Sequence, residues 1–324
     1  MASIRDVAKH AGVSVATVSR VLNDKGYVSV ETRKKVEAAI ADLNYRPNEV
    51  ARSLFNKQSN TLGLILPDIM NPFFPELARA IEDTASKLGY TVILCNSDED
   101  EEKAQRYIDV LLQKYVDGII ISSNTIQEKT IRELTIPVVC IDREISKDIP
   151  TIVVDNKEGA RMATRFLKEK GRRKIGHIRG PLEIINAEER CEGYREVVSG
   201  EEWFQESYIV NGHYRMDTAT EATLELFRRH PDIDGIFAAN DTMAIGAMKA
   251  AYEHGLKVPE DISIIGFDGI ALAKASIPEL TTIEQPLYEL GQKAAKMLIK
   301  LIKGQDVKKT FYQFDVQLIE RDST

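Results

Sequence analysis

The first 45 residues place apolar side chains at the spacing of an α-helix, about 3.6 residues per turn. In the stretch SIRDVAKHAGVSVATVSRVLN, Ser3 and Asp6 are suited to cap a first helix, Ala11-Gly12-Val13 breaks it, and Ser14 caps a second. A third helix is predicted from SVETRKKVEAAIADLNY. The three apolar faces would form one small core, made of Val7, Ala8, Val13, Val18, Val21, Leu22, Val36, Ala39, Ile40 and Leu43.

Two helices joined by a tight turn and followed by a third are typical of a helix-turn-helix, whose second helix lies in the DNA major groove. Small and polar side chains face outward from the predicted second helix. Arg20 can donate two hydrogen bonds to guanine, Val15 and Ala16 can contact a thymine methyl group, and Ser14 and Thr17 can hold phosphates. The alternative is a helical hairpin without a nucleic-acid function.

The next segment, YRPNEVARSLFNKQSN, has a different character. Pro47 ends the third helix, Asn48 can cap a new one, and only EVARSLF remains before a polar linker. Isolated helices shorter than about 12–15 residues are marginal in water. We therefore expect this short helix to form only when another molecule or another part of the protein holds it.

From Thr61 onward, predicted strands and helices alternate, which indicates an α/β body with parallel sheets and right-handed crossovers. Ten strands suit two sheets better than one, and the composition changes near Asp155–Arg161, a natural crossing point. The predicted fold class is an all-α helix-turn-helix head followed by an α/β body of two parallel-sheet subdomains. The predicted strands are TLGLILPD, TVILCNSD, GIIISS, PVVCIDR, TIVVDN, KIGHIRG, SYIVNGH, GIFAAND, ISIIGFDG and TTIEQP.

Polar and aromatic residues follow many of these strands, and ligands of open parallel sheets bind beyond the carboxyl ends of the strands. Flat rings such as Phe73 and Phe74 can lie against the C–H faces of a sugar, while charged and amide groups take its hydroxyls. Each residue taken alone is more often a strand-end cap or a core residue. The candidate binding residues are Asn71, Phe73, Phe74, Asp142, Arg143, Arg190, Tyr214, Asn240, Asp268 and Gln285.

Charge and cysteine content narrow the class of protein. The chain carries a formal charge of −7, but residues 1–60 carry +4 and the remainder −11. A small basic head on an acidic body suggests a polyanion-binding head, although an ordinary solvated domain fits this charge equally well. Cys95, Cys140 and Cys191 have neither metal-knuckle nor disulfide spacing. Without an apolar leader or a run of about 20 apolar residues, we expect a cytoplasmic protein that does not span a membrane.

The chain resembles the lactose/galactose repressor family of bacterial transcription factors, and most closely its members that control ribose operons. The stretches that carry the resemblance are IRDVAKHAGVSVATVSRVLN, VSVETRKKVEAAIADLNYRPNEVARSL and TLGLILPDIMNPFF. The resemblance covers essentially the whole chain. It implies a homodimer that binds the double-stranded DNA of an operator. It also implies a head at 1–46, a hinge helix and linker at 47–60, and a body at 61–324, with subdomains at about 61–158 and 159–289 and a tail that returns to the first.

In that family the hinge helix pairs with its dimer mate in the minor groove and wedges a leucine between the central base pairs. Leu54 occupies that place here, with Asn48 and Arg52 beside it. Such a wedge must be supported by extra contacts from the bent DNA. The rival interpretation makes Leu54 a plain core residue.

The body is similar to periplasmic sugar-binding proteins, and the candidate binding residues match the pieces found in those specific for ribose. The resemblance therefore implies a small sugar, ribose, as the effector. Tyr214 stands where the ribose receptors tend to have phenylalanine, and its hydroxyl could alter the ligand. The span VVSGEEWFQESYIV is shorter than in the family, which puts the cleft rim around Trp203 in doubt.

No catalytic constellation is present: the phosphate-loop, dinucleotide, nucleophile-elbow and HExxH patterns are all missing. We expect neither an enzyme nor a cofactor or metal. Asp142 and Asp268 could act as an acid/base pair in a sugar enzyme, but their arginine and amide neighbours favour binding. A transport receptor would need a signal peptide. Ligands left open within the family are a purine, another pentose, a phosphosugar or a phosphoprotein, and the effector could act as inducer or corepressor.

Overall fold

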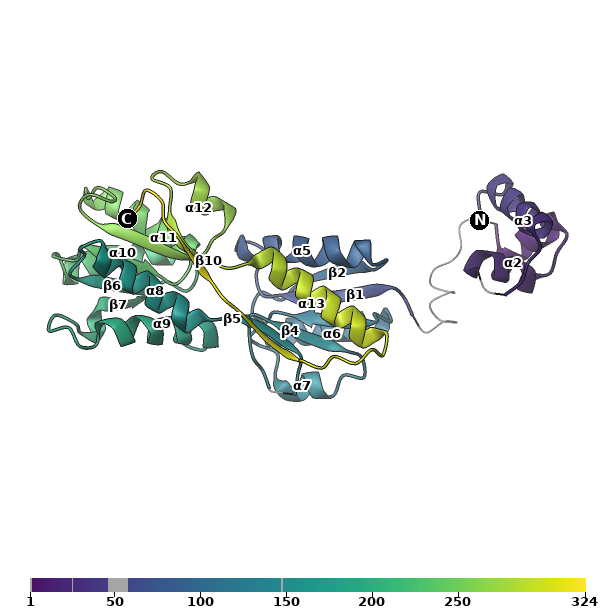
Figure 1. Cartoon of the computed structure of the whole chain (residues 1–324), viewed down its shortest axis with the longest axis horizontal. Helices are drawn as coiled ribbons and strands as arrows, with labels where there is room; N and C mark the ends of the chain where they lie inside the picture. Colours follow the sequence, from purple (N-terminus) through teal and green to yellow (C-terminus); the bar gives the residue numbers. More distant parts are fainter. Residues whose placement is uncertain (1, 25, 46–57, 147) are drawn as a thin grey trace. The chain divides into compact units, whose positions relative to one another are not determined.

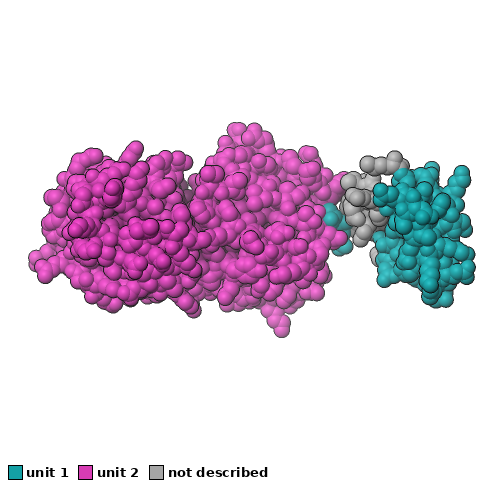
Figure 2. All heavy atoms as spheres, turned by 90° about the horizontal axis from the view of Figure 1, so that it is seen from above, with its two compact units in different colours: residues 1–59 teal, residues 60–324 magenta. Residues whose placement is uncertain are grey.

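The computed structural model describes residues 2–24, 26–45, 58–146 and 148–324. The chain divides into two compact units, Met1–Ser59 and Asn60–Thr324, which Figure 2 draws in different colours. Asn48, Arg52 and Leu54, the predicted hinge residues, lie outside the described residues. Their roles stay predictions.

The described residues of the first unit form three helices, as predicted: α1 (Ile4–Ala11), α2 (Val15–Asn23) and α3 (Val30–Asp42). Ser3 and Asp6 cap α1 reciprocally, and the Ser14 hydroxyl accepts a hydrogen bond from the Thr17 N–H at the start of α2. Gly12 ends α1 with φ 64°, a left-handed conformation that lets the chain turn tightly into α2. The predicted core forms around the fully buried valines Val7, Val18 and Val36.

In the described part of the second unit, the first sheet has six parallel strands in the order β11-β5-β4-β3-β1-β2. We call this sheet and its helices the first lobe. Its strands are β1 (Thr61–Leu66), β2 (Thr91–Asn96), β3 (Gly118–Ile121), β4 (Val138–Ile141), β5 (Thr151–Val154) and β11 (Phe311–Phe314). Its helices are α5 (Phe73–Lys87), α6 (Glu101–Gln113), α7 (Glu128–Arg132) and α13 (Leu287–Ile302).

The second sheet also has six strands among the described residues, in the order β12-β10-β9-β8-β6-β7, and only β12 runs antiparallel to its neighbour. This sheet and its helices are the second lobe. Its strands are β6 (Ile175–Arg179), β7 (Ile209–Asn211), β8 (Gly235–Ala238), β9 (Ser263–Asp268), β10 (Thr281–Glu284) and β12 (Gln317–Ile319). Its helices are α8 (Asn156–Glu169), α9 (Ile185–Val198), the 3-10 turn η1 (Glu206–Tyr208), α10 (Met216–Arg229), α11 (Asp241–His254) and α12 (Ala271–Ala275).

Three connections join the two lobes. The chain leaves β5 for α8, returns from β10 to α13, which packs along α5, and crosses again between β11 and β12 (Figure 1). The prediction of two sheets with a crossing near residue 155 is confirmed, but the ten predicted strands omitted β11 and β12. Both are short and only partly buried, and β12 pairs with β10 over a distance in sequence that no local pattern reveals.

Each sheet is covered by helices on both faces, which explains the near-continuous apolar runs of its strands. In β1, Leu62, Leu64 and Leu66 enter one core cluster while Ile65 enters the opposite one, the alternation expected of a strand. A Cβ at Gly63 would come within 2.6 Å of the Leu111 side chain, so α6 packs closely on this strand. No helix in the described ranges is long and apolar enough to cross a membrane.

Candidate functional site

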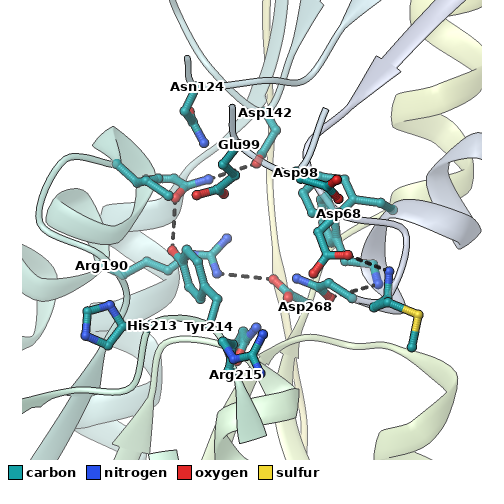
Figure 3. A pocket seen from close by; sticks show the side chains of 17 residues that line it. Asp68, Asp98, Glu99, Asn124, Asp142, Arg190, His213, Tyr214, Arg215 and Asp268 are labelled. Carbon is teal, nitrogen blue, oxygen red and sulfur yellow. Dashed lines mark hydrogen bonds and ion pairs between the residues drawn. The ribbon is translucent and has the colours of Figure 1, made fainter. Parts of the chain in front are cut away.

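A cavity of about 430 Å³ opens at the carboxyl ends of the strands, where both lobes contribute side chains (Figure 3). Eight of the ten predicted binding residues line it, from six separate parts of the chain. They are Asn71, Phe73, Phe74, Asp142, Arg190, Tyr214, Asn240 and Asp268. Most of them follow the carboxyl end of a strand, as predicted, whereas Arg190 lies within α9 and not at a strand end.

Arg190 and Asp268 form a buried ion pair in the cavity wall, with side chains 3% and 6% exposed and an Nη1–Oδ1 distance of 3.2 Å. Arg190 is held by further contacts: its Nε donates to Asn156 Oδ1 at 2.9 Å, and its guanidinium lies 3.8 Å from the centre of the Phe267 ring. Figure 3 shows the pair spanning the middle of the site. A buried arginine fixed in this way presents a rigid fork of donors.

Two further hydrogen bonds connect Tyr214, Asn186 and Asp142 in the cavity wall. The Tyr214 hydroxyl donates to Asn186 Oδ1 at 2.9 Å, and Asn186 Nδ2 donates to Asp142 Oδ2 at 2.8 Å. Asn186 and Tyr214 belong to the second lobe, whereas Asp142 follows β4 in the first. The hydroxyl that distinguishes Tyr214 from phenylalanine is therefore bonded to the protein.

Two of the carboxyl groups that line the cavity, those of Asp142 and Asp268, are harder to ionise than ordinary aspartates. Burial raises the pKa of Asp142 to about 7, with Arg190 opposing the shift and Asp268 adding to it. Burial raises the pKa of Asp268 to about 6, and here Arg190 and the Gln285 amide oppose the shift. Near neutral pH both groups can accept hydrogen bonds, and Asp142 titrates in the same range.

Phe73 and Phe74 begin α5 at the mouth of the cavity and pack edge to face, with ring centroids 5.0 Å apart. Asn71 Oδ1 accepts a hydrogen bond from the Phe73 N–H at 3.2 Å, which fixes the start of the helix. Phe73 is nearly buried and Phe74 half-buried, so both rings serve the core and line the cavity. A cavity lined by aromatic rings together with carboxylates and a guanidinium suits a sugar ring.

Positive φ angles gather at this site. Asp98, Glu99, Asp142, His213, Tyr214 and Asp268 all line the cavity with φ between 52° and 114°. Each such residue costs of order 1–3 kcal/mol when its side chain is bulky, and strain of this kind clusters at ligand sites. The backbone of these residues is thus held in left-handed conformations in which their side chains line the cavity.

The remaining two predicted residues lie behind the cavity lining. Gln285 Nε2 donates to Asp268 Oδ1 at 2.7 Å, and Arg143 Nη1 donates to the Ser123 carbonyl at 3.2 Å. Among the described residues, Arg143 Nε, Gln285 Oε1 and Asn240 Nδ2 are buried polar atoms without a hydrogen-bond partner in the protein. The role of Arg143 and Gln285 as direct ligand contacts stays a prediction.

Several cavity residues were not predicted: Asp68, Met70, Asp98, Glu99, Asn124, Ile184, Asn186, His213 and Arg215. Asp98, Glu99 and Asn124 follow β2 and β3, so the strand-end rule would have found them had it been applied to every strand. Asn186 sits in the first turn of α9, where a polar residue attracts no attention. Trp203, placed in sequence near the cleft rim, packs instead against the apolar cores.

The outward face of α2 carries the predicted DNA-reading residues. Val15, Ala16 and Arg20 are exposed and Thr17 is partly exposed, as the helical pattern requires. Ser14 is also exposed, but its hydroxyl already accepts from the Thr17 N–H at 3.1 Å and lies 2.9 Å from the Thr17 hydroxyl. Ser14 is thus a helix cap first, and a phosphate contact would have to share its hydroxyl.

Comparison with known families identifies both units. Residues 3–48 match the model of bacterial regulatory proteins of the lacI family, and residues 59–320 match that of periplasmic binding proteins and the sugar binding domain of the LacI family. The chain belongs to the LacI family. Its head and its body are thus the regulatory and sugar-binding parts of one kind of protein, as the sequence motifs indicated.

Relatives and solved structures of the LacI family are similar to this chain over nearly its whole length. The ribose operon repressor of Halalkalibacterium halodurans is 50% identical, over 100% of this chain and 97% of its own. The lac repressor dimer bound to operator and the anti-inducer ONPF has a TM-score of 0.89 at 32% identity, covering 99% of this chain and 98% of its own. These relatives are transcriptional regulators and not enzymes.

A third comparison concerns the ligand. A periplasmic binding protein/LacI transcriptional regulator from Alkaliphilus metalliredigens, complexed with D-xylulofuranose, has a TM-score of 0.75 at 37% identity and covers 82% of this chain and 99% of its own. Within the described residues of the present chain, no group of His, Cys, Asp and Glu side chains could hold a metal ion.

Gly180 gives room to the Tyr214 ring, since a Cβ there would come within 2.5 Å of the ring carbon Cζ. We expect Gly180→Ala to displace the ring and weaken effector binding by about tenfold, as overpacking costs ~1–3 kcal/mol. Gly200→Ala is the matched control, because its Cβ would meet nothing within 4 Å. Calorimetric titration of both variants checks the prediction, and equal affinities would show that the ring position is unimportant.

Proposed function

We propose that this LacI-family chain is a transcriptional repressor whose affinity for its operator is controlled by ribose bound in the cavity between the lobes. The observation that carries the proposal is the convergence of eight predicted ribose-binding residues in one cavity. Ribose operon repressors of Halalkalibacterium halodurans and Bacillus subtilis, at 50% and 42% identity over the whole chain, support the choice of sugar. So does the D-xylulofuranose complex of a related regulator, because that ligand is also a five-carbon sugar.

The chemistry of the cavity favours a neutral, hydroxyl-rich ligand. Asp142 and Asp268 accept hydrogen bonds from sugar hydroxyls, Arg190 and the unpaired Asn240 Nδ2 donate to them, and Phe74 faces the apolar side of the ring. Three further carboxylates, Asp68, Asp98 and Glu99, also line the cavity. Their negative charge opposes a phosphosugar, which is one of the alternative ligands left open within the family.

The proposed mechanism couples the sugar to DNA through the hinge. Two chains form a dimer whose heads read the halves of a near-palindromic operator, with the hinge helices of residues 47–60 folding between them. Sugar that closes the lobes changes the points from which the hinges start and favours the DNA-incompetent state. Coupling of ~1–3 kcal/mol, or about 5–150-fold in operator affinity, is typical of such switches. A repressor of this kind acts in the cytoplasm, where its DNA lies.

The deciding experiment is isothermal titration calorimetry of the full chain with D-ribose, ribose 5-phosphate and a purine base, followed by operator binding with each ligand present. We expect ribose alone to bind and to weaken operator binding. Binding of the purine or the phosphosugar instead would reject ribose as effector. Ribose binding that strengthens operator affinity would replace induction by corepression.

The raised carboxyl pKa values predict a pH dependence of ribose binding. Hydroxyls donate to ionised carboxylates, so binding favours deprotonation of Asp142 (pKa about 7) and Asp268 (pKa about 6) and releases protons. Ribose affinity should therefore hold above about pH 7, fall as the pH drops through 7, and fall more steeply below 6, by up to about tenfold per pH unit for each carboxyl that must ionise. Calorimetry in two buffers of different ionisation enthalpy measures the proton release. Constant affinity from pH 5.5 to 8 would contradict the assignment.

A further inference from the structure

Away from the three connecting segments, two side-chain hydrogen bonds of the described residues join the lobes. One runs from the Ala271 N–H to Glu76 Oε1 at 2.9 Å, and neither of these residues lines the effector cavity. The other runs from Asn186 Nδ2 to Asp142 Oδ2 at 2.8 Å and lies in the cavity wall. The second bond therefore joins the two lobes through residues that a ligand in the cavity can also contact.

Asn186 is suited to hold this bond, because both ends of its amide are in use. Its side chain is buried, with 7% of the residue exposed, and its Oδ1 accepts from the Tyr214 hydroxyl at 2.9 Å. An ionised Asp142 only accepts, so the amide nitrogen must face it, and the oxygen is left for the phenol. The donor-to-acceptor direction of the two hydrogen bonds, from Tyr214 to Asn186 and from Asn186 to Asp142, is thereby fixed.

The backbone supports the same arrangement. Asn186 lies one helical turn before Arg190 on α9, so one face of the helix carries both the buried guanidinium and the amide. Asp142 and Tyr214 both adopt positive φ, 67° and 57°, and Gly180 leaves room for the Tyr214 ring. Because Asn186 uses Oδ2 of Asp142, the other carboxylate oxygen is available to a sugar hydroxyl.

We propose that Asn186 is a positioning residue that, together with Tyr214 and Asp142, forms a latch across the cavity, orienting the Asp142 carboxylate toward the sugar and setting how far the lobes close. The inference deepens the proposed function and rests on it for the identity of the sugar. It also gives the Tyr214 hydroxyl a role: it holds Asn186 rather than selecting a different ligand. A ring without the hydroxyl would line the cavity but leave the amide free to turn.

The variant Asn186→Asp tests the latch at constant shape. It can still accept from Tyr214, but it places a carboxylate against Asp142. We expect ribose to bind about tenfold more weakly or worse, because residues in one hydrogen-bond network are energetically coupled. Tyr214→Phe should act in the same direction with a smaller effect, because the bond to Asp142 remains.

Lobe closure is measured independently of the sugar. Spin labels at Lys114→Cys in the first lobe and Glu221→Cys in the second report the interlobe distance, and the three native cysteines are buried. Without ribose, Asn186→Asp should shift the distribution to longer distances. The double variant Asn186→Asp with Asp142→Asn reverses the donor and the acceptor, and it should restore the wild-type distances but not ribose affinity, because the acceptor at 142 is lost.

A pH profile separates positioning from simple folding. The Asn186 amide helps to keep Asp142 ionised, alongside Arg190 and against Asp268 and Glu189, which also face it. Ribose binding by Asn186→Ala should therefore lose affinity at a higher pH than binding by the wild type. Unchanged distances and unchanged ribose affinity in Asn186→Asp, or no restoration in the double variant, would overturn the latch. Failure of the wild type to bind ribose would instead reject the proposed sugar, and the distance measurement would still test the latch.

Discussion

Asp268→Asn is expected to weaken ribose binding by about a hundredfold while operator binding stays intact. Asp268 lies in the cavity wall, where its Oδ1 accepts from Arg190 Nη1 at 3.2 Å and from Gln285 Nε2 at 2.7 Å. The substitution keeps the shape of the side chain but replaces an acceptor by a donor and leaves the Arg190 charge less compensated. One charged hydrogen bond contributes ~1.5–3 kcal/mol, and a loss of ~2.7 kcal/mol corresponds to about a hundredfold in affinity.

The same change in a surface ion pair provides the control. Asp232 forms an exposed pair with Lys174, both residues precede strands of the second lobe, and neither lines the cavity at the carboxyl ends of the strands. Asp232→Asn should leave both ribose and operator affinity unchanged, because exposed pairs contribute little. Calorimetry with ribose and fluorescence anisotropy with operator DNA measure the two functions. If Asp268→Asn binds ribose within about threefold of the wild type, the carboxylate does not contact the sugar.

The binding residues were predictable where chain direction alone decides their position. Strands in a parallel sheet present their carboxyl ends at one edge, so Asn71, Asp142, Asn240 and Asp268 could be brought together without coordinates. Asn186 could not, because its importance lies in two partners, Asp142 and Tyr214, that are distant in sequence. A polar residue in the first turn of a helix looks the same whether it faces solvent or a buried carboxylate.

Arg143 and Gln285 show the opposite limit. Both follow strands and both match the family pattern, yet Gln285 bonds to the lining residue Asp268, and Arg143 bonds to the carbonyl of Ser123, which precedes the lining residue Asn124. The sequence indicates that a polar residue lies near the site. Whether its side chain reaches the cavity surface depends on the other side chains that lie between it and the cavity. Each also keeps one buried polar atom without a protein partner, Arg143 Nε and Gln285 Oε1. Such atoms are costly to bury unpaired, which favours a polar ligand or water nearby.

The fold was predictable in its large elements and less so at its edges. Strands such as β1 and β9 are buried on both faces and read as apolar runs, so the hydrophobic effect alone marks them. The strands β11 (Phe311–Phe314) and β12 (Gln317–Ile319) are edge strands with mostly half-buried side chains, and pairing with β5 and β10 gives them their extended form. That pairing depends on where the chain has already been placed by α13.

Arg20→Ala should weaken specific operator binding more than any other single charge removal in the head. Arg20 is exposed on α2, and no salt bridge of the described residues involves it, whereas Arg33 pairs with Asp24 at 2.6 Å, Lys35 with Glu31 and His10 with Asp42. Its guanidinium is therefore free to donate two hydrogen bonds to guanine in the major groove. A bidentate contact is worth ~1–3 kcal/mol, and two heads per operator give a loss of about 30-fold or more.

Arg33→Ala is the matched control for Arg20→Ala, since it removes the same charge from the same head at a residue already paired with Asp24. It should weaken binding to operator and to random DNA alike, by about threefold or less, through the electrostatic attraction that all sequences share. Arg20→Ala should instead reduce the ratio of operator to random-DNA affinity and relax the preference at a single base pair in each half-site. Anisotropy titrations of both variants against operator, random DNA and operators with single base-pair changes separate the two effects. If both variants lose affinity equally on every sequence, Arg20 contacts phosphate and the base reading belongs to other residues of α2.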